Sequence, residues 1–591
     1  MPEKNKKSQS AAALGSVKDS GRKRRARGGQ KKMADKAKGA KLRVIPLGGL
    51  DAIGKNMTAF ECGGDVILID AGLMFPDDEH IGVDLILPDY TYVLENAHKL
   101  RGIVITHGHE DHTGALPYLL KDLDMSVPIL GTKLTLGLIE GKLAEHRLTK
   151  QPELREVHRG GSAKLGCFEL NFFTVNHSIP GAMGVYLKSP AGNVLHTGDF
   201  KLDTTPIDGE ITDFDALAKF AHEGVDLLMS DSTNADNPNF TRSEAEVGVA
   251  LRQIISSAKR KVIVASFASH IHRIQQICDA AREAGRQVAV TGRSMLTNTQ
   301  IAQDLGYLNV PEGLIVDAYE CSELPPNKIV VLCTGSQGEP LSALARMSVG
   351  EHKTVSIERG DTVIISATPV PGNEKSVTRV INQLSKIGAD VYDKKRAMVH
   401  VSGHAGSEEL KIVLSIVRPN YFLPVHGEAT HLRAHAKLAE AVGIPSDKIF
   451  ILENGDTLTL QGGSITRTDP VESGIVYVDG SSVGDIGRNV LRDRQSMQSE
   501  GAATVCVAFS RSAQERVGEP IIMLRGIPGF DDETFLSDAR ERVSKVFDEG
   551  LEAYNGDKNR LRKTVRDAIG KFIWERCHRR PVIMPVVMEL K

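Results

Sequence analysis

The chain has 591 residues, with 73 Lys and Arg against 75 Asp and Glu, and 41% of its residues are hydrophobic. This composition is typical of globular domains and excludes a collagen, a coiled coil, a small disulfide scaffold and a fully disordered chain. At about 150 residues per domain, the length predicts three or four globular units. No apolar run approaches the roughly 20 residues that cross a bilayer. We therefore expect a chain that is neither membrane-spanning nor exported. Its seven scattered cysteines are expected to be free thiols in a reducing cytoplasm, with a thiolate metal site or a cysteine nucleophile as the alternatives.

The positive charge is concentrated at the amino-terminal end. Residues 1–40 carry thirteen Lys and Arg and three acids, a net charge of +10, which leaves −12 for the remainder. This segment lacks aromatic residues and cannot bury enough apolar area to offset the cost of ordering, so we predict a disordered tail. It lacks the apolar stretch of a signal peptide. The tail is either an electrostatic arm for nucleic acid or a merely solvating extension.

From residue 41 onward, short apolar runs alternate with amphipathic stretches, which predicts layered α/β domains. Strands are predicted at 42–46, 66–70, 102–106, 194–196, 225–230, 262–266, 329–333, 363–366 and 398–401. Helices are predicted at 113–121, 243–258, 270–284, 374–387 and 407–417. A turn-rich stretch at 462–487 precedes a last α/β segment, with strands at 504–510 and 581–590 and helices at 532–555 and 559–576.

Four potential metal ligands stand within six residues, directly after an apolar strand and before a helix: His107, His109, Asp111 and His112. Alternate side chains of an extended segment face the same way, so His107 and His109 can converge on one ion. Asp111 and His112, where the chain turns into the helix, can reach a second ion. Asp111 alone would also fit a helix N-cap, but this spacing of three histidines and an aspartate predicts a metal site.

Single ligand candidates follow later strands: His177, Asp199 and His426. Two imidazoles per ion and one shared carboxylate give two adjacent divalent cations with positions open for water and substrate. We assign His107, His109 and His177 to the first ion, Asp111, His112 and His426 to the second, and Asp199 as the bridge. Imidazole-rich ligation favours zinc, and the two carboxylates leave manganese as an alternative. Asp70, at the end of its strand, is the expected acceptor that fixes a histidine tautomer.

The motif H-x-H-x-D-H, with Asp70 before it and His177, Asp199 and His426 after it, resembles the metallo-β-lactamase superfamily. About 160 residues of separate α/β pattern divide its two parts, between Ser230-Asp231-Ser232-Thr233-Asn234 and His400-Val401-Ser402-Gly403-His404-Ala405. This insertion resembles the β-CASP branch, which acts on nucleic acids. Within that branch, G-G-L-D-A-I-G-K-N-M (48–57), S-D-S-T-N, G-N-E (372–374) and H-V-S-G-H-A resemble the ribonuclease J family. The resemblance covers nearly all of the chain except the tail.

The resemblance implies an α/β fold in which a metallo-β-lactamase αββα sandwich carries an inserted β-CASP α/β domain and a small C-terminal α/β domain. The expected boundaries are a basic tail (1–40), the first part of the metallo-β-lactamase domain (41–233), the β-CASP domain (234–395), the second part of the metallo-β-lactamase domain (396–470), a linker (471–487) and the C-terminal domain (488–591).

Site residues beyond the metal ligands follow from the same resemblance. Asp231 and His404 resemble the catalytic pair of the β-CASP branch, and a carboxylate touching an imidazole can relay a proton to a departing ribose oxygen. The alternative is a structural hydrogen bond.

A second set concerns the substrate phosphate, which ribonuclease J relatives hold with the loop that corresponds to His400, Val401, Ser402, Gly403 and His404. The pattern here also predicts N–H groups that point outward at a helix N-terminus, and the alternative is a turn and cap. Ser269, Asn373 and Glu374 are candidates for the same groove, and they also fit plain cap and turn positions. The Gly-rich loop at 335–340 matches neither nucleotide-binding motif, so we expect no ATP or NAD.

The implied activity is that of a metal-dependent ribonuclease that degrades single-stranded RNA from a 5′-monophosphate end toward the 3′ end and also cuts internally. Roles in rRNA processing and mRNA decay in the cytoplasm would follow. The inserted domain is expected to act as a lid, and the scarcity of aromatic residues argues for backbone binding with weak sequence preference. A homodimer or homotetramer formed through the C-terminal domain, and a partner such as a helicase, are further implications.

Three other readings stay open. The first is a small-molecule hydrolase of the same superfamily, which would not need the insertion between Asp231 and His404. The second is a non-catalytic RNA-binding scaffold, against which the complete ligand set argues. The third is DNA as the substrate, because the metals act on either polymer.

Overall fold

The computed structural model describes residues 39–77, 79–148, 150–339, 341–370, 372–527 and 533–590. The predicted basic tail, apart from residues 39 and 40, lies outside the described residues. The chain divides into two compact units: residues 1–73 with 88–474, and residues 74–87 with 475–591. Among the described helices, none is both long enough and apolar enough to cross a membrane.

The first unit contains an eight-stranded sheet of order β21-β20-β1-β2-β3-β5-β6-β7. Its strands are β1 (Leu42–Gly48), β2 (Met57–Cys62), β3 (Asp65–Ile69), β5 (Leu100–Val104), β6 (Ile129–Gly131), β7 (Leu154–Glu156), β20 (Thr457–Gln461) and β21 (Ser464–Thr468). The helices along this part of the chain are α2 (Thr91–Glu95), α3 (Glu110–Thr113), α4 (Leu116–Leu123) and α5 (Lys133–His146). Because β20 pairs with β1, the late residues 457–468 complete a sheet that begins at residue 42.

A second, six-stranded sheet has the order β19-β12-β11-β10-β9-β8. Its strands are β8 (Ser162–Leu165), β9 (Phe168–Thr174), β10 (Met183–Ser189), β11 (Gly192–His196), β12 (Leu227–Asp231) and β19 (Tyr421–Val425). Phe60 of β2 and Phe168 and Phe172 of β9 are buried in one core between the two sheets. Its other face packs against α6 (Phe214–Glu223), α13 (Ser407–Val417) and α14 (Ala429–Ala441). This arrangement confirms the predicted αββα sandwich.

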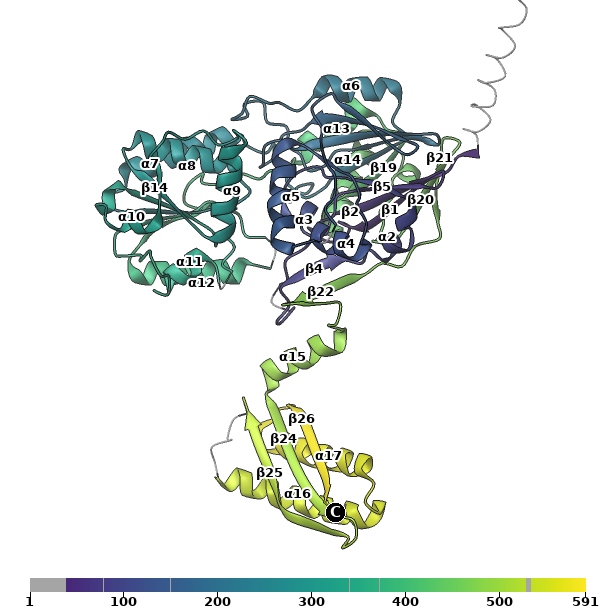
Figure 1. Ribbon diagram of the computed structural model, residues 1–591, viewed down its shortest axis with the longest axis vertical. Coiled ribbons are helices and arrows are strands. Elements are labelled where there is room, and N and C mark those ends of the chain that lie inside the picture. Colours follow the sequence, from purple (N-terminus) through teal and green to yellow (C-terminus); the bar gives the residue numbers. More distant parts are fainter. Residues whose placement is uncertain are drawn as a thin grey trace, which may run out of the picture. The chain divides into compact units, whose positions relative to one another are not determined.

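The inserted domain is a doubly wound, all-parallel sheet of order β15-β14-β16-β13-β17-β18. Its elements are α7 (Glu244–Ser257), β13 (Val262–Ala265), α8 (Ile271–Glu283), β14 (Gln287–Thr291), α9 (Arg293–Asp304), β15 (Ile315–Val316), α10 (Ala318–Ser322), β16 (Ile329–Cys333), α11 (Ala343–Ser348), β17 (Thr362–Ile365), α12 (Glu374–Ile387) and β18 (Asp390–Tyr392). Alternate residues of β13 face opposite cores: Val262 and Val264 pack with α7, α8 and α9, whereas Ile263 packs with α11 and α12. Figure 1 shows these helices on the two sides of the sheet.

Strand direction explains why the candidate ligands converge. Parallel pairing runs from β3 to β5 in the first sheet and from β11 through β12 to β19 in the second. Their carboxyl ends therefore lie at a common edge of each sheet. Polar candidates follow or end these strands: Asp70 follows β3, His107 follows β5, Asp199 follows β11, Asp231 ends β12 and His426 follows β19.

The second unit carries two small sheets, of order β23-β22-β4 and β25-β24-β26. Its elements are β4 (Leu85–Pro88), β22 (Ile475–Asp479), β23 (Ser482–Val483), α15 (Arg488–Glu500), β24 (Ala502–Ser510), β25 (Glu515–Arg525), α16 (Glu533–Tyr554), α17 (Lys558–Cys577) and β26 (Val582–Leu590). The α16 and α17 helices cover one face of β25-β24-β26 (Figure 1).

Two sequence expectations differ from the structure. The strand predicted at 398–401 is absent, because the carbonyl oxygen of Val399 accepts hydrogen bonds from Arg273 and Ser366 instead of pairing with a strand. The stretch at 471–487, predicted to be a linker, contains β22 and β23, which form a sheet with β4. Residues 74–87, which carry most of β4, are likewise grouped with 475–591.

Candidate metal centre and active site

The H-x-H-x-D-H segment turns from the end of β5 into the short helix α3. His107 and His109 stand in the extended part, and His109 is the N-cap of α3 with φ −70° and ψ 155°. Asp111 and His112 lie in the helix itself. The alternation in the extended part and the turn into the helix thus separate the four side chains into two groups, as the spacing predicts.

The first group consists of His107, His109 and His177, whose ligand atoms all lie within 4.8 Å of one another. Nδ1 of His109 is 3.1 Å from Nε2 of His107 and 3.1 Å from Nε2 of His177. Burial lowers the pKa of His109 to about 4. Burial and the neighbouring imidazoles lower the pKa values of His107 and His177 well below the ordinary value. Neutral imidazole is the form that binds a metal.

The second group is Asp111, His112, Asp199 and His426, also within 4.8 Å. Asp199 Oδ2 lies 3.1 Å from His112 Nε2 and 3.7 Å from His107 Nε2, so Asp199 stands between the two groups, where a bridging carboxylate is expected. His426 Nε2 lies 3.2 Å from Asp111 Oδ2. The structure therefore brings all seven predicted ligands together. Their role as ligands stays a prediction.

Carboxylates dominate the electrostatics of this second group. Burial opposes the charged imidazolium, yet Asp199, Asp111 and Asp70 together raise the pKa of His112 well above its ordinary value. Burial also opposes a charged His426, but Asp199, Asp111 and Asp231 raise the pKa of His426 to about 10. Such a concentration of buried negative charge is one that divalent cations would neutralise.

Hydrogen bonds behind the histidines orient their metal-facing nitrogens. Asp70 Oδ2 lies 2.8 Å from His112 Nδ1, while Asp70 also accepts from the N–H and hydroxyl of Thr106. The carbonyl oxygen of Gly403 lies 2.8 Å from His177 Nδ1. These contacts leave Nε2 of His112 and of His177 facing the cluster, as acceptors behind ligating histidines do in zinc sites. The donor set therefore fits a pair of divalent cations.

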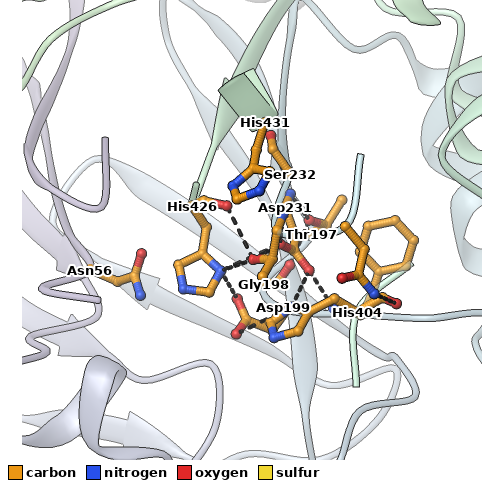
Figure 2. A network of polar contacts seen from close by, with 12 residues as sticks. Asn56, Thr197, Gly198, Asp199, Asp231, Ser232, His404, His426 and His431 are labelled. Carbon is orange, nitrogen blue, oxygen red and sulfur yellow. Dashed lines mark hydrogen bonds and ion pairs between the residues drawn. The ribbon is translucent and has the colours of Figure 1, made fainter. Parts of the chain in front are cut away.

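Asp231 and His404 lie against the metal cluster and in contact with each other. Asp231 Oδ2 is 2.7 Å from His404 Nδ1, and Asp231 Oδ1 is 3.3 Å from His426 Nδ1. Figure 2 shows Asp231 between these two imidazoles. Burial opposes the charge, but Asp231 raises the pKa of His404 above its ordinary value. No hydrogen bond engages Nε2 of His404 within the described chain.

The predicted substrate loop, residues 400–404, leads from the inserted domain to the metal cluster. Among the described residues, no acceptor pairs with the backbone N–H groups of 400–403. The predicted helix N-terminus is different: α13 begins at Ser407, and the N–H groups of Ala405, Gly406 and Ser407 bind Phe200 O, Glu409 Oε2 and Asn237 O. The free donors therefore belong to the loop and not to the helix.

The three remaining candidates lie on loops after parallel strands of the inserted domain. Ser269 precedes His270, the N-cap of α8. Asn373 is the N-cap of α12, and its Nδ2 donates to Gln337 Oε1 at 3.4 Å. The carboxylate of Glu374 accepts from the N–H of Gly372. Contacts to the metal cluster are not among their interactions in the described chain, so their part in the groove stays a prediction.

Three further side chains contact this site, although their motifs entered the sequence analysis only as a resemblance. Asn56 Nδ2 lies 3.0 Å from His112 Nε2 and donates to the carbonyl oxygen of Asp111 at 3.1 Å. The hydroxyl of Thr233 donates to Asp231 Oδ1 at 2.8 Å. Asn234 Nδ2 donates to Ser402 Oγ at 2.9 Å and to His404 O at 3.0 Å. The available signal was local: Thr233 and Asn234 directly follow a strand that ends in a catalytic candidate.

Family models match most of the chain in consecutive segments. A beta-lactamase superfamily domain matches residues 64–271, and the ribonuclease J beta-CASP domain matches 259–384. A Zn-dependent metallo-hydrolase RNA specificity domain matches 388–451, and the ribonuclease J C-terminal domain matches 489–590.

Relatives of similar length agree with these matches. The chain is 42% identical to ribonuclease J of Mycolicibacterium smegmatis over 93% of this chain and 97% of that protein. It is 38% identical to ribonuclease J2 of Bacillus subtilis over 93% of this chain and 99% of that protein. It is 41% identical to ribonuclease J of Thermus thermophilus over 92% and 95% of the two chains. A crystal structure of a protein of unknown function from Enterococcus faecalis shares the fold alone, with 13% identity, a TM-score of 0.50 and coverage of 71% of this chain and 100% of that chain. Since identity near 40% extends over almost the full length of these proteins, the chain belongs to the ribonuclease J family of the metallo-β-lactamase superfamily.

Proposed function

We propose that the chain is a metal-dependent ribonuclease that hydrolyses phosphodiester bonds of single-stranded RNA. It acts from the 5′ end toward the 3′ end, prefers a 5′-monophosphate, and also cuts internally. The observation that carries this proposal is that the seven-residue His/Asp cluster lies beside the Asp231–His404 pair and the N–H groups of residues 400–403, for which the described residues offer no acceptor. Family membership supports RNA as the polymer.

Two divalent cations, zinc or alternatively manganese, would be held by His107, His109 and His177, by Asp111, His112 and His426, and by Asp199 between them. When bound, such a pair supplies an activated water and neutralises charge on the phosphate in the transition state. Asp70 and the carbonyl oxygen of Gly403 hold the imidazoles of His112 and His177 in the ligating orientation.

The Asp231–His404 pair supplies proton transfer. Asp231, fixed by the hydroxyl and N–H of Thr233, keeps His404 protonated at Nδ1 and raises its pKa. The remaining nitrogen, Nε2, then donates a proton to the departing ribose oxygen. We expect His404→Ala to retain both metals by elemental analysis and to lose a factor of about 10²–10⁴ in turnover. Turnover at the wild-type rate in that variant would remove His404 from catalysis.

The loop of residues 400–404 holds the substrate phosphate. Consecutive N–H groups for which the described residues offer no acceptor can bind an anion together, with no need of a helix N-terminus. Asn234 donates to Ser402 Oγ, and the carbonyl oxygen of Gly403 binds His177, so side chains that follow strands of the second sheet position the loop. Ser269, Asn373 and Glu374 extend this groove on the β-CASP side in our proposal.

A comparison of RNA ends tests the activity directly. Purified full-length protein is incubated with 5′-monophosphorylated and 5′-triphosphorylated RNA of one sequence, with and without a chelator, and with DNA of the same sequence as a control. We expect chelator-sensitive release of mononucleotides that favours the monophosphate. Hydrolysis of a lactone or thioester by protein that leaves both RNAs intact would instead identify a small-molecule hydrolase.

We also propose that two copies associate through the C-terminal sheet to form a homodimer or a higher homo-oligomer. On the face of β25-β24-β26 away from α16 and α17, Ile521 is 60% exposed, Met523 50% and Met584 45%. Contiguous exposed apolar surface of this kind is typical of an interface. Sedimentation of Ile521→Glu/Met584→Glu should show a smaller species than wild type, while Ile211→Glu, at a residue 45% exposed in the other unit, serves as the control. A monomeric wild-type protein would contradict the proposal.

Cytoplasmic location is part of the same proposal. Cys62, Cys167, Cys278, Cys333 and Cys506 form no disulfide, as is usual in a reducing compartment.

A further inference from the structure

A fully buried arginine ties the inserted domain together at the edge nearest the metal centre. Arg273, in the first turn of α8, is 0% exposed. Its Nε lies 2.5 Å from Oε1 of Glu244 and its Nη2 lies 2.8 Å from Oε2, so the pair is bidentate. Glu244 is the first residue of α7 and is 6% exposed. The ion pair thus joins the first turns of two neighbouring helices.

The remaining guanidinium nitrogen reaches two other segments. Nη1 of Arg273 donates to the carbonyl oxygen of Ser366, which directly follows β17, and to the carbonyl oxygen of Val399 at 2.8 Å. The hydroxyl of Ser366 donates to the same oxygen of Val399 at 2.7 Å. Two donors therefore hold one carbonyl of a segment that pairs with no strand.

This carbonyl lies at the start of the segment that carries the proposed substrate loop. Val399 and Val401 are buried in the core shared by α7, α8 and β13. Four residues after Val399, the carbonyl of Gly403 binds His177, and His404 binds Asp231. Residues 399–404 thus cross from the core of the β-CASP domain to the metal centre. Residues 400–402 are therefore held between two bound carbonyls, that of Val399 on the β-CASP side and that of Gly403 at the metal centre.

The two neighbouring histidines, His270 and His400, do not balance the positive charge of Arg273, because both are neutral. His270 Nε2 lies 3.6 Å from Glu244 Oε2, and burial lowers the pKa of His270 to about 4. Burial lowers the pKa of His400 well below its ordinary value, and the charge of Arg273 lowers it further. Both rings are therefore neutral at physiological pH. The carboxylate of Glu244 is then the partner that balances the guanidinium.

Folding stability gives no sufficient reason for such a pair, because apolar residues of similar size often stabilise a core equally well. An arginine offers what those residues lack, namely several donors in a fixed planar fork. Here the guanidinium of Arg273 binds three segments at once, through Glu244, Ser366 and Val399.

We propose that Arg273 and Glu244 are positioning residues that fix the β-CASP end of residues 399–404, and thereby the placement of the substrate phosphate relative to the metal centre. This rests on the proposed ribonuclease function. We call the Arg273–Glu244 pair, with its bonds to Ser366 and Val399, the clamp. Loss of the clamp should impair reaction with RNA much more than reaction with a small phosphodiester, which needs the metals but not the loop.

The test compares Arg273→Met and Arg273→Met/Glu244→Leu with Arg260→Met as the matched control. Arg260 also pairs with a buried acid of the same domain, Asp361 at 3.1 Å, but both precede their strands and so lie at the opposite edge of the sheet. The double variant leaves no unpaired buried charge, so it should regain thermal stability relative to the single variant. It should not regain loop placement, since Val399 still lacks the arginine donor.

Three measurements are made on each full-length, metal-loaded variant: kcat and KM with 5′-monophosphorylated RNA, the rate with bis(p-nitrophenyl) phosphate, and amide hydrogen exchange of residues 404–406, whose N–H groups are bound by Ser402 Oγ, Phe200 O and Glu409 Oε2. For both Arg273 variants we expect a loss of about 100-fold in kcat/KM with RNA, as a displacement near 1 Å can cause. We expect rates with the small diester within a factor of about three of wild type, because p-nitrophenolate leaves without a proton. Exchange at 404–406 should be faster in both variants, because a loosened loop weakens these hydrogen bonds, and unchanged in Arg260→Met.

Two results would overturn the proposal that Arg273 and Glu244 position the loop. One is wild-type kcat/KM with RNA and wild-type exchange in the double variant. The other is a parallel loss of zinc, of activity on the small diester and of activity on RNA, which would assign Arg273 a purely structural role. If wild-type protein does not cleave RNA, the proposed function fails, whereas exchange at residues 404–406 still tests whether Arg273 and Glu244 position the loop.

Discussion

The close approach of Gly403 to His177 allows a quantitative prediction for Gly403→Ala. A Cβ at residue 403 would lie 2.7 Å from Cε1 and 2.8 Å from Nδ1 of His177, whereas ordinary contacts begin at 3.4 Å. The imidazole and the loop must therefore separate by about 0.7 Å, the difference between 3.4 and 2.7 Å. His177 is buried among the other candidate ligands, so it cannot rotate away freely.

Either response to this overlap harms the site. If His177 moves, it loses the carbonyl acceptor of Gly403, and loss of such an outer hydrogen bond typically costs about 10- to 100-fold in metal affinity. If the loop moves, the proposed phosphate site moves with it, and a displacement near 1 Å can cost about 100-fold in rate. We expect kcat/KM with RNA to fall by about 100-fold in both cases.

Zinc affinity by competition with a chromophoric chelator, measured beside kcat/KM, separates the two responses. Gly474→Ala is the control, because the nearest atom to its added Cβ would be 3.7 Å away, an ordinary contact. A folded Gly403→Ala protein with both wild-type zinc affinity and wild-type kcat/KM would refute the tight coupling between the loop and His177.

Two further variants probe groups behind the site. Asp70→Asn replaces the carboxylate that faces His112 Nδ1 at 2.8 Å, so zinc affinity by the same competition assay should fall by about 10- to 100-fold; an unchanged affinity would contradict this orienting role. Glu244→Gln probes acid stability: burial opposes the charge, but Arg273 holds the pKa of Glu244 well below 4.5, its ordinary value. A carboxyl with a depressed folded pKa contributes stability above its unfolded pKa and loses it as the pH falls toward the folded value. The difference in free energy of unfolding between wild type and Glu244→Gln, from urea titrations, should therefore be constant above pH of about 5 and shrink below about 4.5. A difference that does not change between pH 6 and pH 3 would contradict the depressed pKa.

Local patterns predicted much of the fold. The strand at 329–333 and the helices at 374–387 and 407–417 have the predicted bounds, because each combines an uninterrupted apolar period with a clear cap or turn. The strand at 398–401 was wrong for a reason that lies outside its own sequence. Its apolar residues are buried as expected, but its backbone is bound by Arg273, a residue 126 positions away.

The residues of the candidate site also differ in how far local patterns could predict them. His107, His109, Asp111 and His112 are recognisable together because one strand and one turn position them. By contrast, the contact of Asn56 with His112 depends on the packing of loops that no local pattern encodes. The prediction of a helix N-terminus with free N–H groups at the substrate loop was wrong. The N–H groups of residues 405–407 are bound by Phe200, Glu409 and Asn237, which come from three separate segments.

The late position of His404 and His426 has a consequence during protein synthesis. A ribosome that has translated only the first part and the insertion has made Asp231 but neither imidazole, and it has not made β19, which pairs with β12. The growing polypeptide therefore lacks a complete reaction centre until most of the chain has emerged. A nascent chain that ends before residue 404 thus lacks the groups with which the proposed centre would cleave the messenger that encodes it.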